Sequence, residues 1–343
     1  MSENGEVANG HLITFLLGAG ASANALPTVK DFPDRVEELI VRLNSFKEEE
    51  NAQSDNQFVL DLETIIDALQ WMSVESKKHA SVDTFAKKLY LRRIYGRGDD
   101  YKKLKAAMSV FFVLEQAGKA VDKRYDAFFA SLLSRINGFP EEIRVLTWNY
   151  DFQLEQAYSQ YLGTDSISAC QETLRIAGKG VFEYSNNPDN FRMFKLNGTA
   201  AFKRKLDDPE YGCSLNEKWG KTFLEKVISS YAFIINENTL KSALSFAWEE
   251  ENDDSDNSWI KKAAYAVKDT SVLVVIGYSF PFFNRSVDRK IIGSMKNLKK
   301  VYFQDPAALA LKEKFRSVLS NLDEIELVPI DKEQDQFFLP YEL

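Results

Sequence analysis

The stretch Leu12-Ile-Thr-Phe-Leu-Leu-Gly-Ala-Gly-Ala-Ser22 decides the fold of this 343-residue chain. An apolar run passes directly into a cluster of small residues, which is typical of a buried parallel strand that ends in a tight turn. Similar runs lie at Ile143–Thr147, 271–276 and Lys300–Gln304, and a shorter one at 191–196. Each is followed by polar or glycine residues, so we expect these runs to be strands of one sheet.

Helical patterns separate the expected strands. They lie at 33–46, 60–71, 101–116 and 125–136. In the first, Val36, Leu39, Ile40 and Leu43 follow the spacing of a core-facing helical stripe. The sequence therefore predicts an α/β fold, a doubly wound Rossmann-type parallel sheet with a large, mostly helical insertion at about 33–140. We expect a single domain over 11–343 and a flexible N-terminus at 1–10.

Composition limits the possible functions. Lys and Arg number 43 against 51 Asp and Glu, a net charge of −8, so broad attraction to nucleic acid or anionic membrane is not expected. A local basic groove stays possible. Cys170 and Cys213 are the only cysteines, and His11 and His79 the only histidines, so a zinc site with four cysteine ligands cannot be built. With no secretory pattern at 1–10, we expect a cytoplasmic protein.

The segment Gly18-Ala-Gly20 follows the first strand, where a backbone of small residues can approach a pyrophosphate and the next helix can offer its N-terminal amides. A purely structural tight turn explains the same residues. The dehydrogenase fingerprint is incomplete, because Ala23 stands where its third glycine would fall and no acidic residue ends a second strand some 20 residues later.

Polar and small residues also follow the other expected strands, at 147–151, 194–199, 277–279 and Asp305. Carboxyl ends of parallel strands share one edge of a sheet, so Thr147, Asn149 and Asp151 should face the same crevice as the glycine segment. Taken alone, Asp151 is better explained as the cap of the following helix.

Together these segments resemble a known family. Gly18-Ala-Gly-Ala-Ser22, Thr147-Trp-Asn-Tyr-Asp151, Lys195-Leu-Asn-Gly198 and Ile276-Gly-Tyr-Ser279 are similar, in order and separation, to the signature blocks of sirtuin-like bacterial antiviral NADases. Glu63 resembles the acidic helix that follows the glycine segment in this family. The resemblance spans about residues 11–306 and implies NAD+ as substrate, with no metal. It implies a cofactor-binding set of Gly18, Ala19, Gly20, Ala21, Ser22, Thr147, Gly277, Tyr278, Ser279 and Asp305.

The resemblance also implies the chemistry. Family members cleave the nicotinamide–ribose bond and deplete NAD+ during phage infection, and the implied catalytic positions are Asn149, Asp151 and Asn197. The family has a His where this chain has Asn197. An amide cannot act as a general base, and the loss of a general base lowers the reaction rate by about 10²- to 10⁴-fold. Either a natural variant or a deliberate substitution explains Asn197, and the near-isosteric size of Asn favours the second.

We therefore expect an NAD+ glycohydrolase effector of abortive infection, impaired by Asn197. A catalytically silent NAD+ or ADP-ribose binding regulatory subunit is the alternative, and a nucleotide-dependent oxidoreductase is the weakest hypothesis. Protein deacetylation is not expected, because that branch of the family carries a zinc module with four cysteine ligands and this chain has two Cys. An effector that destroys an essential metabolite needs gating, so a homo-oligomer or a second defence protein is the expected partner, with no membrane and no direct indication of nucleic acid.

Overall fold

The computed structural model describes residues 12–50, 56–96, 100–134, 138–181, 185, 187–204, 210–236, 240–249, 258–319, 322–332 and 334–343. The expected flexible segment 1–10 and His11 lie outside the described residues.

A seven-stranded sheet forms the centre of the molecule, in the order β3-β4-β2-β1-β7-β8-β9. All neighbouring strands in it are parallel. Its strands are β1 Leu12–Leu17, β2 Ile143–Thr147, β3 Ile176–Gly178, β4 Met193–Lys195, β7 Thr270–Ile276, β8 Lys300–Gln304 and β9 Glu326–Ile330. The chain first builds outward from β1 through β2 and then returns to β7 on the other side of β1. The predicted doubly wound α/β fold is confirmed.

Two strands of this sheet were not expected from the sequence, and neither was the separate antiparallel pair at Gly198–Arg204 and Leu240–Leu244. β3 has only three residues, too few for a periodic signal, and β9 is an edge strand that contains Pro329. By contrast, the expected strands at 12–17, 143–147 and 300–304 have the predicted bounds.

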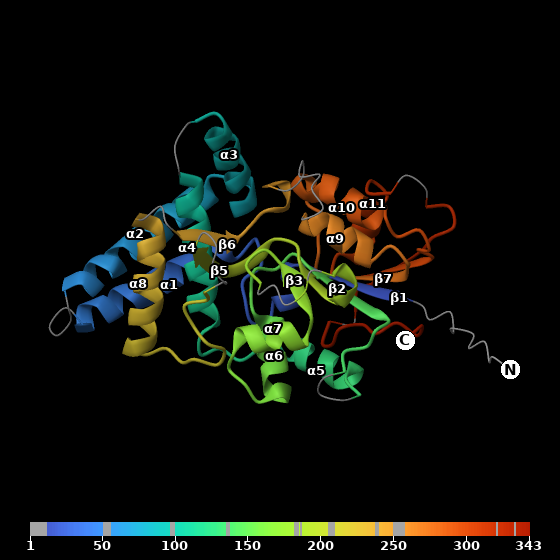
Figure 1. Ribbon diagram of the computed structural model, residues 1–343. Coiled ribbons are helices and arrows are strands. Elements are labelled where there is room, and N and C mark those ends of the chain that lie inside the picture. Colours follow the sequence, from blue (N-terminus) through green and yellow to red (C-terminus); the bar gives the residue numbers. More distant parts are fainter. Residues whose placement is uncertain are drawn as a thin grey trace.

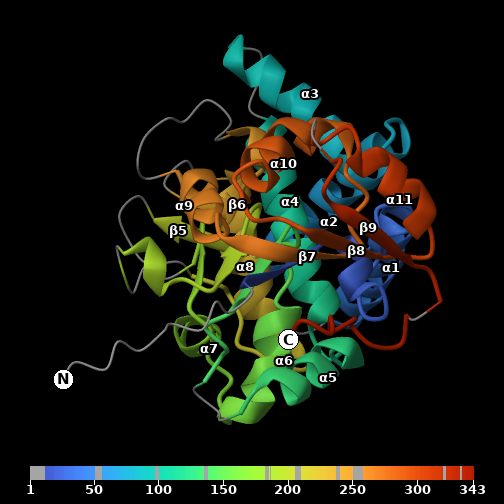
Figure 2. The same cartoon turned by 90° about the vertical axis from the view of Figure 1, so that its right-hand side faces the viewer.

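Alternate residues of the strands point to opposite faces, and helices cover both. Leu16 and Val275 lie in one hydrophobic cluster with α9 Trp259–Ala266, α10 Arg285–Ile292 and α11 Ala308–Phe315. Phe15 and Val274 lie in the other cluster. Figures 1 and 2 show α9, α10 and α11 on one side of the sheet and α5 Lys123–Leu132, α6 Gln153–Leu162 and α7 Ile167–Thr173 on the other.

A helical layer stands at one end of the sheet (Figure 1). The segment between β1 and β2 supplies α1 Phe32–Glu50, α2 Asn56–Lys77, α3 Val82–Ile94 and α4 Asp100–Gln116. A later part of the chain completes the layer: α8 Lys221–Asn236 packs on α2 and α4, and the antiparallel pair β5 Gly198–Arg204 and β6 Leu240–Leu244 packs on α4. The layer therefore joins two separate stretches of sequence.

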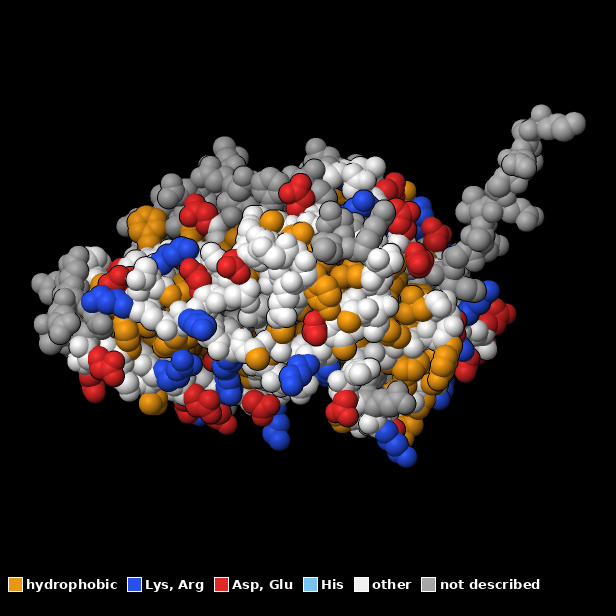
Figure 3. All heavy atoms as spheres, turned by 90° about the horizontal axis from the view of Figure 1, so that it is seen from below, with side chains coloured by type: hydrophobic (Ala, Val, Ile, Leu, Met, Phe, Trp, Pro, Cys, Tyr) orange, Lys and Arg blue, Asp and Glu red, His pale blue; other side chains and the backbone are white. Residues whose placement is uncertain are grey.

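The surface formed by α5, α6 and α7 is mixed in charge. Figure 3 looks at the molecule from this side, where acidic and basic side chains are interspersed among scattered hydrophobic ones. Alternating charge of this kind suits solvent contact rather than the tracking of a nucleic-acid backbone.

Candidate functional site

A cavity of about 270 Å³ opens at the carboxyl ends of the central strands. It lies where the winding of the sheet reverses, between the ends of β1 and β7, which is the usual ligand position in open α/β sheets. Segments following β1, β2 and β7 form its floor, and α1, α3 and α4 close it from the side of the helical layer. The sheet and the helical layer thus build the site together.

The glycines of the first segment are required by backbone packing. A Cβ on Gly20 would lie 2.6 Å from the Cα of Gly277, and one on Gly18 would lie 2.5 Å from the Gly277 carbonyl oxygen. Gly277 itself has a φ of +58°, which favours glycine. The ends of β1 and β7 are therefore locked together, as the tight-turn explanation requires.

The glycine segment is hydrogen-bonded to the end of β7. Gly18 N–H donates to the Ile276 carbonyl, and Gly20 N–H donates to the Gly277 carbonyl. A short 3₁₀ turn, Ala19–Ser22, follows, and the first α-helix begins only at Phe32. The α-helix expected after the glycines therefore does not follow them directly, because the 3₁₀ turn and the segment up to residue 31 intervene.

Arg124, at the start of α5, braces the same turn from behind. Its guanidinium donates to the carbonyls of Gly20 and Ala21, at 3.0 and 3.1 Å, and pairs with Asp122. Asp122 in turn accepts from the backbone N–H of Asn24. Nothing in the local sequence of Arg124 indicated this role, since the contact spans about a hundred residues of chain.

Ser22, Asn149 and Asp151 form one hydrogen-bonded network. Ser22 Oγ donates to Asp151 Oδ2 at 2.9 Å, and Asn149 Nδ2 donates to Ser22 Oγ at 3.2 Å and to the Gly18 carbonyl at 3.0 Å. Tyr125 OH also hydrogen-bonds to Ser22 Oγ, at 3.0 Å. The predicted crevice residues of the first two segments are thus in direct contact.

Asp151 lines the cavity and lies just before α6. Its Oδ1 accepts from Gln153 N, the first residue of that helix, at 3.0 Å, but the N-cap position belongs to Phe152 and not to Asp151 as expected. Burial raises the pKa of this carboxyl, and the nearby Lys195 ammonium opposes the rise. Lys195 also donates to the Asp151 carbonyl and pairs with the buried Glu155 at 2.8 Å.

Asn197 follows β4 and sits between two strand ends. Its Nδ2 donates to the Trp148 carbonyl at 3.1 Å and to Tyr150 OH at 3.3 Å. Tyr150 OH donates onward to Asp83 Oδ1 at 3.1 Å. A chain of hydrogen bonds therefore links Asn197 to a carboxylate on α3, a residue that no motif indicated.

An aromatic wall closes the side nearest β7. Trp148 and Tyr278 are stacked, with ring centroids 5.5 Å apart and planes within 12° of parallel. Tyr278 OH donates to Asp288, and Asn284 Nδ2 donates to Tyr278 OH at 3.1 Å. Burial raises the pKa of Asp288 to about 8, so this carboxyl is largely protonated near neutral pH.

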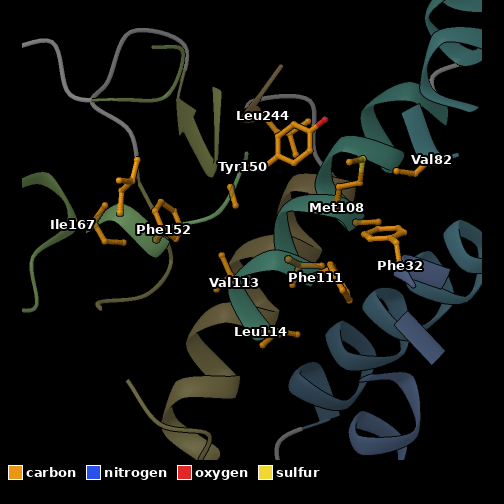
Figure 4. Close-up of a cluster of buried hydrophobic side chains, with 14 of the residues drawn as sticks. Phe32, Val82, Met108, Phe111, Val113, Leu114, Tyr150, Phe152, Ile167 and Leu244 are labelled. Carbon is orange, nitrogen blue, oxygen red and sulfur yellow. The ribbon is translucent and has the colours of Figure 1, made fainter. Parts of the chain in front are cut away.

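Apolar side chains form the opposite end. Figure 4 shows Phe32, Val82 and Met108, from α1, α3 and α4, pointing toward one another beside Tyr150. Leu26 and Phe112 complete this apolar lining.

The charges of the cavity have one sign. Among the described residues that line it, Asp83 and Asp151 are ionisable carboxyls, and none is Lys or Arg. Aromatic rings and carboxylates together attract a cationic ring, through cation–π and Coulomb interactions. The cavity therefore suits a flat, positively charged group better than a phosphate.

The structure brings eight of the predicted site residues to the cavity: Ala19, Ser22, Asn149, Asp151, Asn197, Gly277, Tyr278 and Ser279. Gly18, Gly20 and Ala21 lie in the turn behind its wall, and Thr147 Oγ1 accepts from Asn149 N. Asp305 is not among the lining residues, and its carboxylate caps the turn before α11 by accepting from Ala307 N. Glu63 pairs with Lys47 on the helical layer.

In the described part of the chain, no cluster of His, Cys, Asp and Glu is arranged to hold a metal ion, and no helix has the length and apolar character needed to cross a membrane. His79 hydrogen-bonds to the Glu75 carbonyl and packs on Phe85. Comparison with protein-family models and with curated proteins finds no match for this chain.

Proposed function

We propose that this protein is an NAD+ glycohydrolase that binds the nicotinamide riboside half of NAD+ in the cavity. The observation that carries the proposal is the combination of an aromatic wall, Trp148 and Tyr278, with two carboxylates, Asp83 and Asp151, and no lining cation among the described residues. The nicotinamide ring of NAD+ is a flat cation, so it is complementary to this lining.

The size of the cavity supports binding of half a dinucleotide. Its volume of about 270 Å³ lies just below the roughly 300–1,000 Å³ of typical small-molecule sites. The diphosphate and adenosine would extend outward past Ser279, which lines the cavity after β7. Arg124 contributes positive charge behind the glycine turn, although Asp122 largely balances it.

The chemistry of glycoside cleavage fits these residues. Breaking the nicotinamide–ribose bond develops positive charge on the ribose, and nicotinamide leaves as a neutral molecule. A carboxylate such as Asp151, held by Ser22 and by Gln153 N, stabilises that charge without moving. Asn149 and Asn197 are fixed in direction by their hydrogen bonds, so they orient the ribose or the attacking water.

We further propose that the activity serves antiviral defence by depleting NAD+, as the resemblance to sirtuin-like NADases implies. On this proposal a second copy of the chain or another defence protein gates the enzyme. The alternative, a silent NAD+ or ADP-ribose binding subunit, draws support from Asn197, whose amide is engaged by Trp148 and Tyr150 and cannot exchange a proton.

Calorimetric titration with NAD+ and NADH tests the binding mode. The reduced ring of NADH is neutral but otherwise similar in shape, so it serves as the matched ligand. We expect NAD+ to bind at least about tenfold more tightly, equivalent to about 1.4 kcal/mol. Equal affinity for NAD+ and NADH would show that the positive charge of the nicotinamide ring does not contribute to binding. Absence of NAD+ binding would overturn the proposed function.

A further inference from the structure

Resting on the proposed NAD+ hydrolysis, we propose that Asp83 is the general base of this site, held in place by Tyr150 and supported through it by Asn197. Asp83, in the helical layer, would accept the proton, because the amide of Asn197 cannot. Asp83 lies in the first turn of α3 and lines the cavity opposite the ends of β2 and β4.

The geometry around Asp83 is that of a positioned carboxylate. Tyr150 OH donates to Asp83 Oδ1 at 3.1 Å while it accepts from Asn197 Nδ2 at 3.3 Å. The Tyr150 ring packs on Phe112, with centroids 5.4 Å apart, and burial raises the pKa of its hydroxyl well above the ordinary value. Tyr150 therefore stays protonated and directs its hydrogen bond at Asp83.

The surroundings of Asp83 tune its basicity. Burial raises the pKa of Asp83 to about 6, and the hydrogen bond from Tyr150 partly offsets the rise. The titratable groups that face it across the cavity are Tyr150 and Asp151 after β2 and Tyr278 after β7, whereas α4 presents Met108 and Phe112. A base with a pKa near 6 is ionised at neutral pH and still accepts protons readily.

The proposed step conserves atoms and charge. The oxygen of a water molecule forms a bond to C1′ of the ribose, and the C1′–nitrogen bond breaks with its electron pair going to nicotinamide. One proton of the water passes to Asp83 and from there to solvent. NAD+ and water thus give ADP-ribose, nicotinamide and one proton.

The test compares Asp83→Asn, Tyr150→Phe and Asp34→Asn with the wild-type protein. Asp34→Asn is the matched control, because Asp34 is also an acidic residue in the first turn of a helix but is exposed and outside the cavity. Nicotinamide release is measured from pH 5 to pH 9, and NAD+ affinity is measured in parallel by calorimetry.

We expect Asp83→Asn to lower kcat by about 10²- to 10⁴-fold and to weaken NAD+ binding by no more than about tenfold, because Asp151 and the aromatic wall remain in the cavity. Asp34→Asn should retain full activity. Wild-type activity should rise with pH through about 6, and Asp83→Asn should lose this limb. Tyr150→Phe should move the limb to higher pH, because Asp83 loses the bond that lowers its pKa. In the Asp83→Asn protein, the added substitution Asn197→His should raise kcat at least about tenfold, because the histidine supplies a base on the other side of Tyr150.

The outcomes separate the two proposals. An Asp83→Asn enzyme within threefold of the wild type, with an unchanged pH profile, overturns the role of Asp83 and leaves the proposed function intact. A wild-type protein that neither binds nor cleaves NAD+ overturns the proposed function. A wild-type protein that binds NAD+ without cleaving it, at any pH, overturns both the base and the hydrolase and leaves the silent subunit.

Discussion

Lys195→Met should destabilise the protein strongly and disturb the site at the same time. Lys195 Nζ lies 2.8 Å from Glu155 Oε1, and the two side chains are 1% and 0% exposed. At that separation the direct attraction is about 6 kcal/mol with an effective dielectric constant of about 20. Most of this offsets desolvation, but removing one partner leaves the other charge buried and unpaired, which costs about 3–5 kcal/mol.

The assay is thermal unfolding followed by circular dichroism. For a chain of this size about 1 kcal/mol corresponds to roughly 2 °C, so Tm should fall by about 6–10 °C. The double variant Lys195→Met, Glu155→Gln removes both charges and keeps a side chain for the hydrogen bond from Gln171 Nε2. It should recover at least half of the loss. A fall of less than about 2 °C in the single variant, or a double variant no more stable than the single, would refute the reasoning.

The same substitution reaches the cavity through Asp151. Lys195 donates to the Asp151 carbonyl, and its charge opposes the upward shift in the pKa of the Asp151 carboxyl. Lys195→Met should therefore raise that pKa further. Activity below neutral pH should fall more than activity at pH 8, because more of Asp151 is protonated.

Two further predictions concern the packing and the pH dependence of stability. Gly20→Ala would place a Cβ 2.6 Å from the Cα of Gly277, so it should lower the free energy of unfolding by about 1–3 kcal/mol and weaken NAD+ binding. Gly220→Ala is the control, because its Cβ would have nothing within 4 Å, and it should change neither property. Thermal unfolding curves of the two variants check this, and equal Tm values would contradict it. Asp288→Asn should become progressively more stabilising as pH rises from about 4 to about 8. The folded-state pKa of about 8 exceeds the unfolded value of 3.8, so between these pH values the folded wild-type protein keeps the proton while the unfolded chain releases it, and rising pH favours the unfolded chain. Denaturant unfolding at pH 5 and pH 8 measures the difference, and a constant difference between the two proteins would count against a buried, protonated Asp288.

Much of the sheet could be predicted because its signals are local. Apolar runs that end in glycine or polar residues identify β1, β2, β7 and β8, and the rule that carboxyl ends share one edge brings Ser22, Asn149 and Asp151 together. The helical stripe that contains Val36 and Leu39 likewise predicts α1, because its periodicity is set by the buried face of a single helix.

The other side of the cavity could not be predicted, because it depends on packing between distant segments. In the local sequence Asp83 is only a charge at the start of a helix capped by Ser81. The packing of α3 on α2 and α4, in the helical layer, brings it to Tyr150. Arg124 and Phe32 reach the site in the same way. Asp305 shows the converse, since its strand end is at the correct edge but lies beyond β7, and its carboxylate accepts from Ala307 N in the turn before α11 instead.

The most direct test of the account is the amount of nicotinamide released when the purified 343-residue protein is incubated with NAD+ at pH 7.5. Chromatography separates and quantifies nicotinamide, ADP-ribose and remaining NAD+ over time. The account predicts nicotinamide and ADP-ribose in equal amounts, with the Asp83→Asn protein slower by at least about a hundredfold. NAD+ that stays intact in the presence of the wild-type protein, alone or with added candidate partners, would contradict the central claim.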